Sequence, residues 1–384
     1  MLLPVILGAL AALSAVLTLW QFAVARRFPL HARATDTSFA PGVSLLKPLK
    51  GRDAETERCL RSWFAQNYSG PVQILFGVAD AADPVCELVR ALLAAHPRAD
   101  AELVICGPPV CPNAKVSTLA QLERRARHEL LIISDADVRV PPDLLASLVA
   151  PLRDPAVGLA NCFYQLASPR TFAMRCEAVA INADFWSQVL QSRSLKPLDF
   201  ALGAVMATRA GALRQIGGFP ALGDDLADDY QLGHRLAATG ARIELSPVVV
   251  ECWEAPMNWR QVWAHQLRWA RTIRACQPAP YFFSILSNAT FWPVVWFAVA
   301  PSRLSLLGAL GCIFLRRLTA AYHYAKLTRS GNLLVPWLAM VKDLLGAIIW
   351  AQAFLGNHVI WRGVRYRVLR GGKLVREAAT AVSR

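Results

Sequence analysis

The sequence predicts an α/β protein, with a mixed, mostly parallel sheet flanked by helices, one N-terminal transmembrane helix and a C-terminal membrane region. Three observations support this fold class. The middle of the chain alternates short apolar strands with helical stretches, an apolar segment opens the chain, and 55% of the 384 residues are hydrophobic while the formal net charge is +14. This composition is typical of a membrane-attached protein with a soluble part.

The N-terminal segment is an almost uninterrupted apolar run over residues 2–25 that ends in Arg26 and Arg27. A helix rises about 1.5 Å per residue, so this run is long enough to cross a hydrocarbon core of about 30 Å. A cleavable signal peptide is the alternative, but no basic residue precedes the run and the arginine pair follows it. We therefore predict a transmembrane anchor over residues 1–27, with the chain that follows in the cytoplasm.

The soluble part runs from about residue 41 to residue 280. Its first strands are predicted in VSLLKPL, VQILFGVAD and AELVICG, and helical stretches over residues 55–66 and 84–95 separate them. This alternation favours parallel strands with helices on both faces of the sheet. Ligands of such sheets bind beyond the carboxyl ends of the strands, so the polar residues there are the candidates for function.

A buried strand within LLIISDADV, residues 130–138, ends in Asp135 and Asp137. Residues at i and i+2 of an extended segment share a face, and two carboxylates that close are favourable when a cation lies between them. Mg²⁺ or Mn²⁺ bridging to a substrate diphosphate fits this pair. A solvated junction between strand and turn is the alternative interpretation, because the DxD pattern is common.

Two more polar residues follow neighbouring predicted strands. Asp80 closes VQILFGVAD, where it is able to accept hydrogen bonds from a nucleobase or ribose, or to cap the next helix. Lys115 lies in PNAKVSTL, a loop that leads into a helix. Its positive charge either binds a diphosphate or is simply solvated. The sequence leaves both alternatives open.

The acidic segment GDDLADDYQLG precedes a helix with apolar residues at helical spacing. Asp228 and Asp229 lie near its start, where free N–H groups and the helix dipole stabilise negative charge, so capping is one interpretation. The other is a general base, which has to be a carboxylate within hydrogen-bonding reach of an acceptor hydroxyl. We predict Asp229 for that role.

An aromatic and basic segment, WRQVWAHQLRWARTIR, precedes the C-terminal apolar region and carries His265, Arg268 and Trp269. Arginine and tryptophan together are able to bind a leaving diphosphate and to stack on a ring. The same composition suits a helix at a membrane interface that faces anionic headgroups. Both interpretations remain open, and they are compatible.

Taken in chain order, five motifs resemble the signature of family 2-like inverting glycosyltransferases with a GT-A fold: PGVSLLKPLKG, FGVADAADP, SDADVRV, LADDYQLG and HQLRWARTIR. They are most similar to the ceramide glucosyltransferases, glycosyltransferase family 21, including bacterial hopanoid-associated relatives. The resemblance covers about residues 41–278.

The resemblance implies a membrane-bound enzyme that moves a single sugar from a UDP-sugar to a lipid hydroxyl, with UDP-glucose and ceramide as substrates and glucosylceramide as product. Transfer of N-acetylglucosamine from its UDP derivative to a hopanoid polyol is the alternative. A processive polysaccharide synthase and a non-catalytic lipid-binding scaffold are further rivals. The resemblance also implies Mg²⁺ or Mn²⁺ as cofactor.

The resemblance also implies a role for each candidate residue. Asp80 would bind the uridine portion, Asp135 and Asp137 the metal and diphosphate, and Lys115 a phosphate. Asp229 would be the catalytic base, and Arg268 and Trp269 would complete the product-side pocket. One position departs from the family's pattern. The box that ends in Arg-Trp usually opens with Gln or Arg, whereas this chain has His265, which is still able to donate to a phosphate or sugar oxygen.

The C-terminal third contains apolar segments over residues 281–300, 304–315 and 333–355. The last one carries Lys342 and Asp343 near its centre, and such charges are costly in lipid unless they face a partner or a cavity. We therefore expect two crossings plus one re-entrant or interfacial segment in the membrane region, residues 281–360.

The last residues, 361–384, form a basic tail that we expect in the cytoplasm. Together with the anchor, this predicts a multi-pass protein of the inner (cytoplasmic) membrane whose catalytic domain, residues 41–280, faces the cytoplasm. The expected partners are the bilayer, the lipid acceptor and the UDP-sugar. Nucleic acid is not expected, because basic residues and aromatics do not interleave on the soluble sheet.

Overall fold

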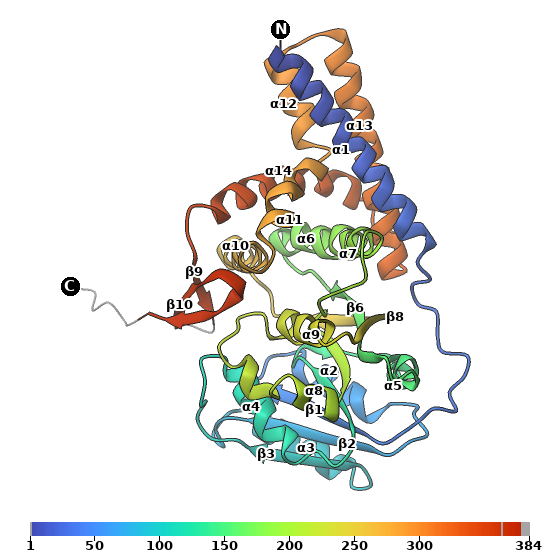
Figure 1. Cartoon of the computed structure of the whole chain (residues 1–384), viewed down its shortest axis with the longest axis vertical. Helices are drawn as coiled ribbons and strands as arrows, with labels where there is room; N and C mark the ends of the chain where they lie inside the picture. Colours follow the sequence, from blue (N-terminus) through green and yellow to red (C-terminus); the bar gives the residue numbers. More distant parts are fainter. Residues whose placement is uncertain (1, 362–363, 378–384) are drawn as a thin grey trace, which may run out of the picture. The chain divides into compact units, whose positions relative to one another are not determined.

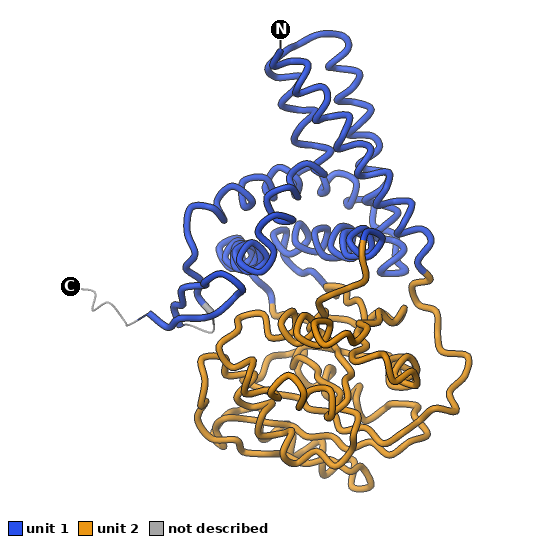
Figure 2. Tube along the Cα trace, viewed as in Figure 1, with its two compact units in different colours: residues 1–28, 168–195, 256–384 blue, residues 29–167, 196–255 orange. Residues whose placement is uncertain are grey.

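The computed structural model of the chain describes residues 2–361 and 364–377 (Figure 1). Part of the predicted basic tail, residues 362–363 and 378–384, lies outside the described residues. The chain divides into two compact units (Figure 2). The sheet unit comprises residues 29–167 and 196–255, and the helical unit comprises residues 1–28, 168–195 and 256–384.

An eight-stranded sheet, in the order β3-β2-β1-β4-β7-β6-β8-β5, forms the centre of the sheet unit. Its strands are β1 (Val43–Leu49), β2 (Val72–Val78), β3 (Asp100–Ile105), β4 (Leu130–Ser134), β5 (Val138–Arg139), β6 (Val157–Ala167), β7 (Val205–Arg209) and β8 (Arg242–Trp253). β7 is antiparallel to both its neighbours and β5 is antiparallel to β8, while the remaining neighbours are parallel. The predicted mixed, mostly parallel sheet is thus confirmed.

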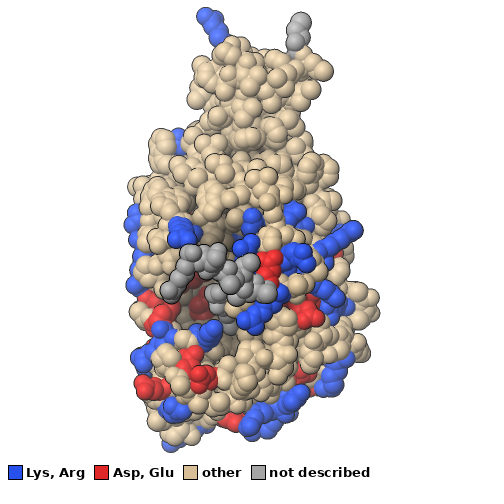
Figure 3. Space-filling model, turned by 90° about the vertical axis from the view of Figure 1, so that its left-hand side faces the viewer, with Lys and Arg blue, Asp and Glu red and all other residues tan. Residues whose placement is uncertain are grey.

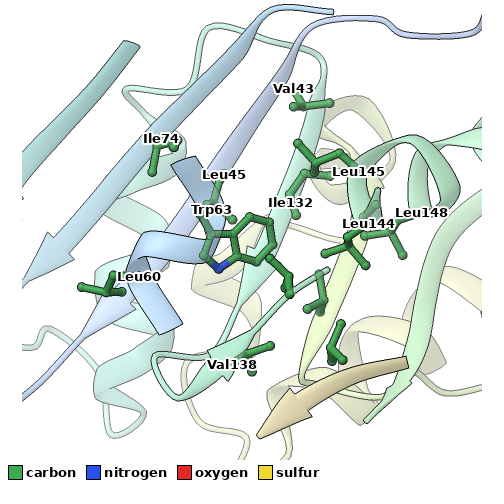
Figure 4. Close-up of a cluster of buried hydrophobic side chains, with 14 of the residues drawn as sticks. Val43, Leu45, Leu60, Trp63, Ile74, Ile132, Val138, Leu144, Leu145 and Leu148 are labelled. Atoms are coloured by element: carbon green, nitrogen blue, oxygen red, sulfur yellow. The ribbon is translucent and has the colours of Figure 1, made fainter. Parts of the chain in front are cut away.

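Helices cover this sheet and complete its core. They are α2 (Thr56–Phe64), α3 (Val85–Ala95), α4 (Ala114–Glu123), α5 (Leu144–Val149), η1 (Ala150–Arg153), α8 (Ala210–Gln215), η3 (Phe219–Leu222) and α9 (Asp228–Ala238). Figure 4 shows Trp63 of α2 among Leu45, Ile132 and Leu144, and all four side chains are buried. Burying a side chain of this size contributes about 2 kcal/mol or more, which fixes α2 on the sheet.

The parallel register brings the ends of the central strands to one edge. Leu46 of β1 lies opposite Leu75 of β2 and opposite Ile133 of β4, so the three strands finish side by side. Asp80 follows the end of β2 and Asp135 follows the end of β4. The carboxylates that the sequence singled out are therefore at the carboxyl edge of the parallel strands, where open α/β sheets bind their ligands.

The helical unit holds the remaining elements. Its helices are α1 (Leu2–Arg27), α6 (Phe172–Val179), the π-helix η2 (Ala180–Phe185), α7 (Trp186–Arg193), α10 (Trp259–Cys276), α11 (Pro278–Phe283), η4 (Ser284–Ser287), α12 (Phe291–Val299), α13 (Arg303–Thr328), α14 (Val335–Ala353) and η5 (Arg370–Gly372). The strands β9 (His358–Trp361), β10 (Val364–Val368) and β11 (Leu374–Arg376) form a small antiparallel sheet. In this unit α1 packs on α7, α12 and α13, and α14 packs on α6, α10 and α13.

Within the described residues, α1 and α13 are the two helices long and apolar enough to cross a membrane on their own. A third crossing is possible if α11–η4 and α12, which meet at a 60° bend, act as one broken span. On the face drawn in Figure 3, the end of the helical unit around α12 is almost free of charged side chains. Large apolar side chains such as Val5 and Leu307 are more than half exposed there. Such a surface indicates membrane association.

The charged pair in the last apolar segment has partners inside the helical unit. Arg316 of α13 donates from Nε to Asp343 Oδ2 at 2.8 Å and from Nη2 to Asp343 Oδ1 and Asp184 Oδ2, both at 2.9 Å. Lys342 also pairs with Asp184 and Asp343. The apolar stretch over residues 304–315 forms the first part of a longer helix, because α13 continues past Arg316, whose charge these carboxylates compensate.

Candidate active site

Lys115 and Asp135 form the centre of the candidate site in the sheet unit. The Lys115 Nζ atom lies 2.7 Å from Asp135 Oδ1 and 3.0 Å from Asp228 Oδ2. Lys115 is buried, and these carboxylates outweigh the cost of desolvation and raise its pKa well above the usual range. A lysine ammonium paired with two carboxylates therefore lies at the end of β4.

The position of Lys115 follows from the start of α4. Asn113 caps this helix, with its side-chain oxygen accepting from the backbone N–H of Lys115 at 3.0 Å and of Val116 at 3.2 Å. The Asn113 amide donates in turn to Asp225 O at 2.9 Å and Asp228 Oδ1 at 3.3 Å. The loop before α4 and the start of α9 are thereby tied together by fully buried hydrogen bonds.

Asp137 lies two residues beyond Asp135 in the turn between β4 and β5. Its backbone carbonyl accepts from Trp253 N at 2.9 Å, which fixes the turn, and its side chain is half-buried. Desolvation and the negative charge of Asp135 raise the pKa of Asp137 to about 6. Among the described residues, no Lys or Arg nitrogen lies within ion-pairing distance of its carboxylate, so the pair fits a divalent cation, which would relieve this repulsion.

A second lysine, Lys47, supports the same turn from inside the sheet. It lies in the middle of β1, donates to Ser134 Oγ at 3.2 Å and also to the backbone carbonyl of Asp135. It is fully buried, and desolvation lowers its pKa to about 8. Lys47 was not predicted as a site residue, although a lysine inside the apolar strand VSLLKPL was a visible signal.

The acidic residues at the start of α9 have different surroundings. Asp228 is buried and both its oxygens are engaged, by Asn113 and by Lys115. Asp229 accepts from the backbone N–H of Tyr230 at 2.7 Å through Oδ1 and is half-buried. Desolvation and the charge of Asp228 raise the pKa of Asp229 to about 6. Of the two, Asp229 is the carboxylate better placed to take a proton near neutral pH.

The segment before β7 connects Asp229 with the end of β4. A Cβ atom added to Gly203 would lie 2.5 Å from Asp229 Oδ2, so only glycine leaves room for this carboxylate. The next residue, Ala204, accepts from Asp135 N at 3.3 Å through its carbonyl. Asn161 fixes the segment by accepting from Leu202 N at 3.1 Å. The contribution of Gly203 was not predicted, since it depends on contact between distant parts of the chain.

Asp80 is exposed at the end of β2, and its Oδ1 accepts from Ala82 N at 2.9 Å. Asp83, which precedes the first turn of α3, accepts from Val85 N at 3.0 Å and Gly51 N at 2.9 Å. None of the contacts described for Asp80 joins it to the cluster around Lys115. It lies on the same strand edge, and its assignment to the uridine portion stays a prediction.

The predicted box lies on α10 in the helical unit. His265 and Trp269 are one helical turn apart, and their ring centroids lie 4.7 Å apart in an edge-to-face arrangement. Arg268, the residue before Trp269, is half-buried. The His265 Nδ1 atom lies 2.8 Å from Glu177 Oε1, which also accepts from Gln266 Nε2 at 2.8 Å. Glu177 was not predicted from the sequence.

The two groups of residues suit different parts of a transfer reaction. The sheet unit offers two carboxylates for a cation, a lysine for phosphate charge and a carboxylate with a raised pKa for proton transfer. The helical unit offers the aromatic and basic residues of α10 and many exposed apolar side chains. The residues of the sheet unit are by themselves of the kinds needed to activate a hydroxyl against a phosphorylated leaving group.

Comparison with known proteins gives a consistent result. The family model described as "Glycosyl transferase family 21" matches residues 5–374. "Ceramide glucosyltransferase 1" of Caenorhabditis elegans is 27% identical over 228 residues, which is 57% of this chain and 47% of that protein. "Ceramide glucosyltransferase" of Candida albicans is 32% identical over 128 residues, 30% of this chain and 24% of that protein. The chain thus spans about half the length of the worm relative, and less of the fungal one.

Among solved structures, a mannosyltransferase from Pyrobaculum calidifontis in complex with GDP-Man and Mn²⁺ is similar in fold. The TM-score is 0.51 and the sequence identity 24%, and the match covers 88% of this chain and 99% of that one. The likeness supports the GT-A fold class that the motifs implied.

Proposed function

The chain belongs to glycosyltransferase family 21, and from this premise we propose that it transfers a single sugar from a UDP-sugar to a lipid hydroxyl. UDP-glucose as donor and ceramide as acceptor, with glucosylceramide as product, are the proposed substrates. The observation that carries the proposal is the cluster in which Lys115 joins Asp135 to the start of α9, with Asp229 beside it. Its ceramide glucosyltransferase relatives point to the same chemistry.

For the donor, Asp80 binds the uridine portion, and Lys115 offers positive charge to the diphosphate. Asp135 and Asp137 would hold Mg²⁺ or Mn²⁺, and the Mn²⁺ in the complex of the similar mannosyltransferase agrees with this. Such an ion, when bound, offsets the negative charge that grows on the departing diphosphate. Lys47 fixes the backbone of this turn by donating hydrogen bonds to Ser134 Oγ and to the carbonyl of Asp135.

For the acceptor, Asp229 takes the proton of the lipid hydroxyl. The oxygen forms a bond to the anomeric carbon while the bond from that carbon to the diphosphate oxygen breaks, and the electron pair leaves with UDP. Attack from the face opposite UDP inverts the configuration, so an α-linked donor gives a β-linked product. Gly203 lacks a Cβ atom that would clash with the Asp229 carboxylate, so the carboxylate is able to occupy this position.

The helical unit supplies the acceptor's surroundings in this proposal. His265, Arg268 and Trp269 contact the leaving diphosphate and the product side. We assign residues 1–27 to the anchor, 41–280 to a cytoplasmic catalytic domain, 281–360 to the membrane region and 361–384 to a cytoplasmic tail. The protein then lies in the inner membrane as a multi-pass enzyme, and parts of the catalytic domain, residues 168–195 and 256–280, belong to the helical unit.

The test is to express the full chain in a host that lacks sphingolipids and hopanoids. Its membranes receive UDP-glucose or UDP-N-acetylglucosamine with either ceramide or a hopanoid polyol, and the lipid products are weighed by mass spectrometry. Hexosylceramide made by the wild type and not by Asp229→Asn supports the proposal. If a glycosylated hopanoid forms, the acceptor is a hopanoid polyol and not ceramide. A polymeric product indicates a processive synthase. No product with any pair of substrates indicates a lipid-binding scaffold.

A further inference from the structure

We propose that Glu177 is a positioning residue for His265, which holds the imidazole so that Nε2 is the ring nitrogen presented to substrate. The inference rests on the proposed function, because it assumes that the box on α10 contacts the sugar nucleotide. It assigns a role to a residue of α6 that the motifs do not include.

The contact between the two side chains is direct. Glu177 Oε1 lies 2.8 Å from His265 Nδ1 and accepts a second hydrogen bond, from Gln266 Nε2, also at 2.8 Å. α6 and α10 pack against each other inside the helical unit, so the contact joins two elements far apart in the sequence. One carboxylate oxygen is thus within hydrogen-bonding distance of two neighbouring residues of α10.

The burial of Glu177 indicates that its carboxylate has a specific task. The residue is 2% exposed, and within the described residues its Oε2 has no hydrogen-bond partner. A buried carboxylate with an unsatisfied oxygen costs free energy that an apolar residue of similar size would avoid. Such a group requires an explanation, and here the hydrogen bonds it accepts from α10 supply one.

The chemistry of the pair determines which ring nitrogen is left for substrate. Glu177 Oε1 accepts from Gln266 Nε2, and we assign it the acceptor role toward His265 Nδ1 as well, which places a proton on that nitrogen. Nε2 has no hydrogen-bond partner in the described part of the chain, and the His265 side chain is 15% exposed. The edge of Trp269 restrains the ring from another side. This is the same logic by which a second partner fixes the tautomer of a metal-binding histidine.

The pair also accounts for the departure of this chain from the pattern of its box. A glutamine or arginine, which usually opens the box, brings N–H donors whose positions do not depend on a tautomer. A histidine has to be fixed by a neighbour before one nitrogen is reliably presented. Glu177 should therefore matter when residue 265 is histidine, and matter little when it is glutamine.

The first experiment is a double-mutant cycle in the full-length protein in lipid nanodiscs, with UDP-glucose and ceramide as substrates. We expect Glu177→Met to lower kcat by about tenfold in the wild-type background, a typical cost of losing such a partner. Glu177→Gln, which retains an acceptor oxygen, should lose less than about threefold. In the His265→Gln background, Glu177→Met should cost less than about twofold. Glu57→Gln, on the surface of α2, is the matched control and should change nothing.

The second experiment needs no turnover. Ring ¹⁵N-labelled histidine in the full chain reports which nitrogen carries the proton, and His265→Gln identifies the signal. We expect a protonated Nδ1 in the wild type, and loss of that proton to Nε2 in Glu177→Met.

An unprotonated Nδ1 in the wild type, or an equal loss of kcat from Glu177→Met in both backgrounds, overturns the inference. If the expected ring signals are seen but no lipid product forms, the pair stands and the proposed function fails. If lipid product forms and Glu177→Met has full activity, the proposed function stands and the role of Glu177 is rejected.

Discussion

Lys115 lies with its Nζ atom 2.7 Å from Asp135 Oδ1, at the edge of the sheet where β4 ends. The same ammonium is 3.0 Å from Asp228 Oδ2, so it joins the turn that carries the carboxylate pair to the helix that carries the proposed base. This arrangement explains why three motifs that are far apart in the sequence act on one substrate in the proposal. Four features of the cluster are open to direct test.

Replacing Lys115 by methionine should destabilise the protein, because Asp228 would then be buried without its cation. Removing one partner of a buried pair costs about 3 kcal/mol, and UDP affinity should fall as well. Chemical unfolding and UDP binding measure the two effects. Lys196→Met, which breaks an exposed pair with Asp199, is the control and should change stability by less than about 0.5 kcal/mol. Equal stability of both variants would contradict the role of Lys115.

Activity should fall at low pH because Asp229 has to be ionised to accept a proton. Desolvation and the charge of Asp228 raise its pKa to about 6. Below that pH, kcat/KM should drop by about tenfold per pH unit, and above it the rate should level off. Lys115→Met should move this limb to higher pH, since the lysine lowers the pKa of Asp229. If kcat/KM does not change through pH 6, or if the pH at which it falls is the same in Lys115→Met, Asp229 is not the general base.

Chelation should abolish transfer, and added Mn²⁺ or Mg²⁺ should restore it. In Asp137→Asn the metal concentration for half-maximal activity should rise by more than about tenfold, a cost that even indirect partners of metal ligands reach. Asp100→Asn, which affects an exposed aspartate of β3, should behave as the wild type. Full activity of the wild type after chelation would show that transfer does not require a metal ion.

Gly203→Ala should reduce kcat strongly while the protein stays folded. The new Cβ would lie 2.5 Å from Asp229 Oδ2 and 3.0 Å from its Cγ, so the carboxylate has to move. A displacement of about 1 Å at a reacting group is able to cost about 100-fold in rate. Gly311→Ala, at a helical glycine with open space around it, is the control. Comparable activity of the two variants would show that Asp229 need not hold its position.

Much of the sheet could be predicted because its strands are locally encoded. The run that ends at Asp135 is apolar, of strand length and followed by polar residues, and the structure has β4 there. The place of β7 between β4 and β6, antiparallel to both, could not be inferred, since pairing between distant strands leaves no periodic signal in one sequence. Gly203 owes its role to that pairing.

The same limit applies to charge. The sequence marks Lys342 and Asp343 as costly in an apolar segment, but it does not say that Arg316 and Asp184 compensate them. The acidic motifs could be found from sequence and Lys47 left a signal as a lysine in an apolar strand, whereas Glu177 is recognised only through its contacts. Residue type predicts what chemistry is possible, and packing decides which residues are able to perform it together.

In the proposed reaction, Asp229 activates a lipid hydroxyl for inverting transfer from a UDP-sugar. The most direct measurement is the linkage of the product formed by the purified full chain from UDP-glucose, which is α-linked, and ceramide, read by NMR of the anomeric proton. We expect β-glucosylceramide from the wild type and a loss of activity of at least about 100-fold with Asp229→Asn. The exposed Asp224 lies in the same acidic segment, and Asp224→Asn should retain full activity. An α-linked product, or undiminished transfer by Asp229→Asn, would contradict the account.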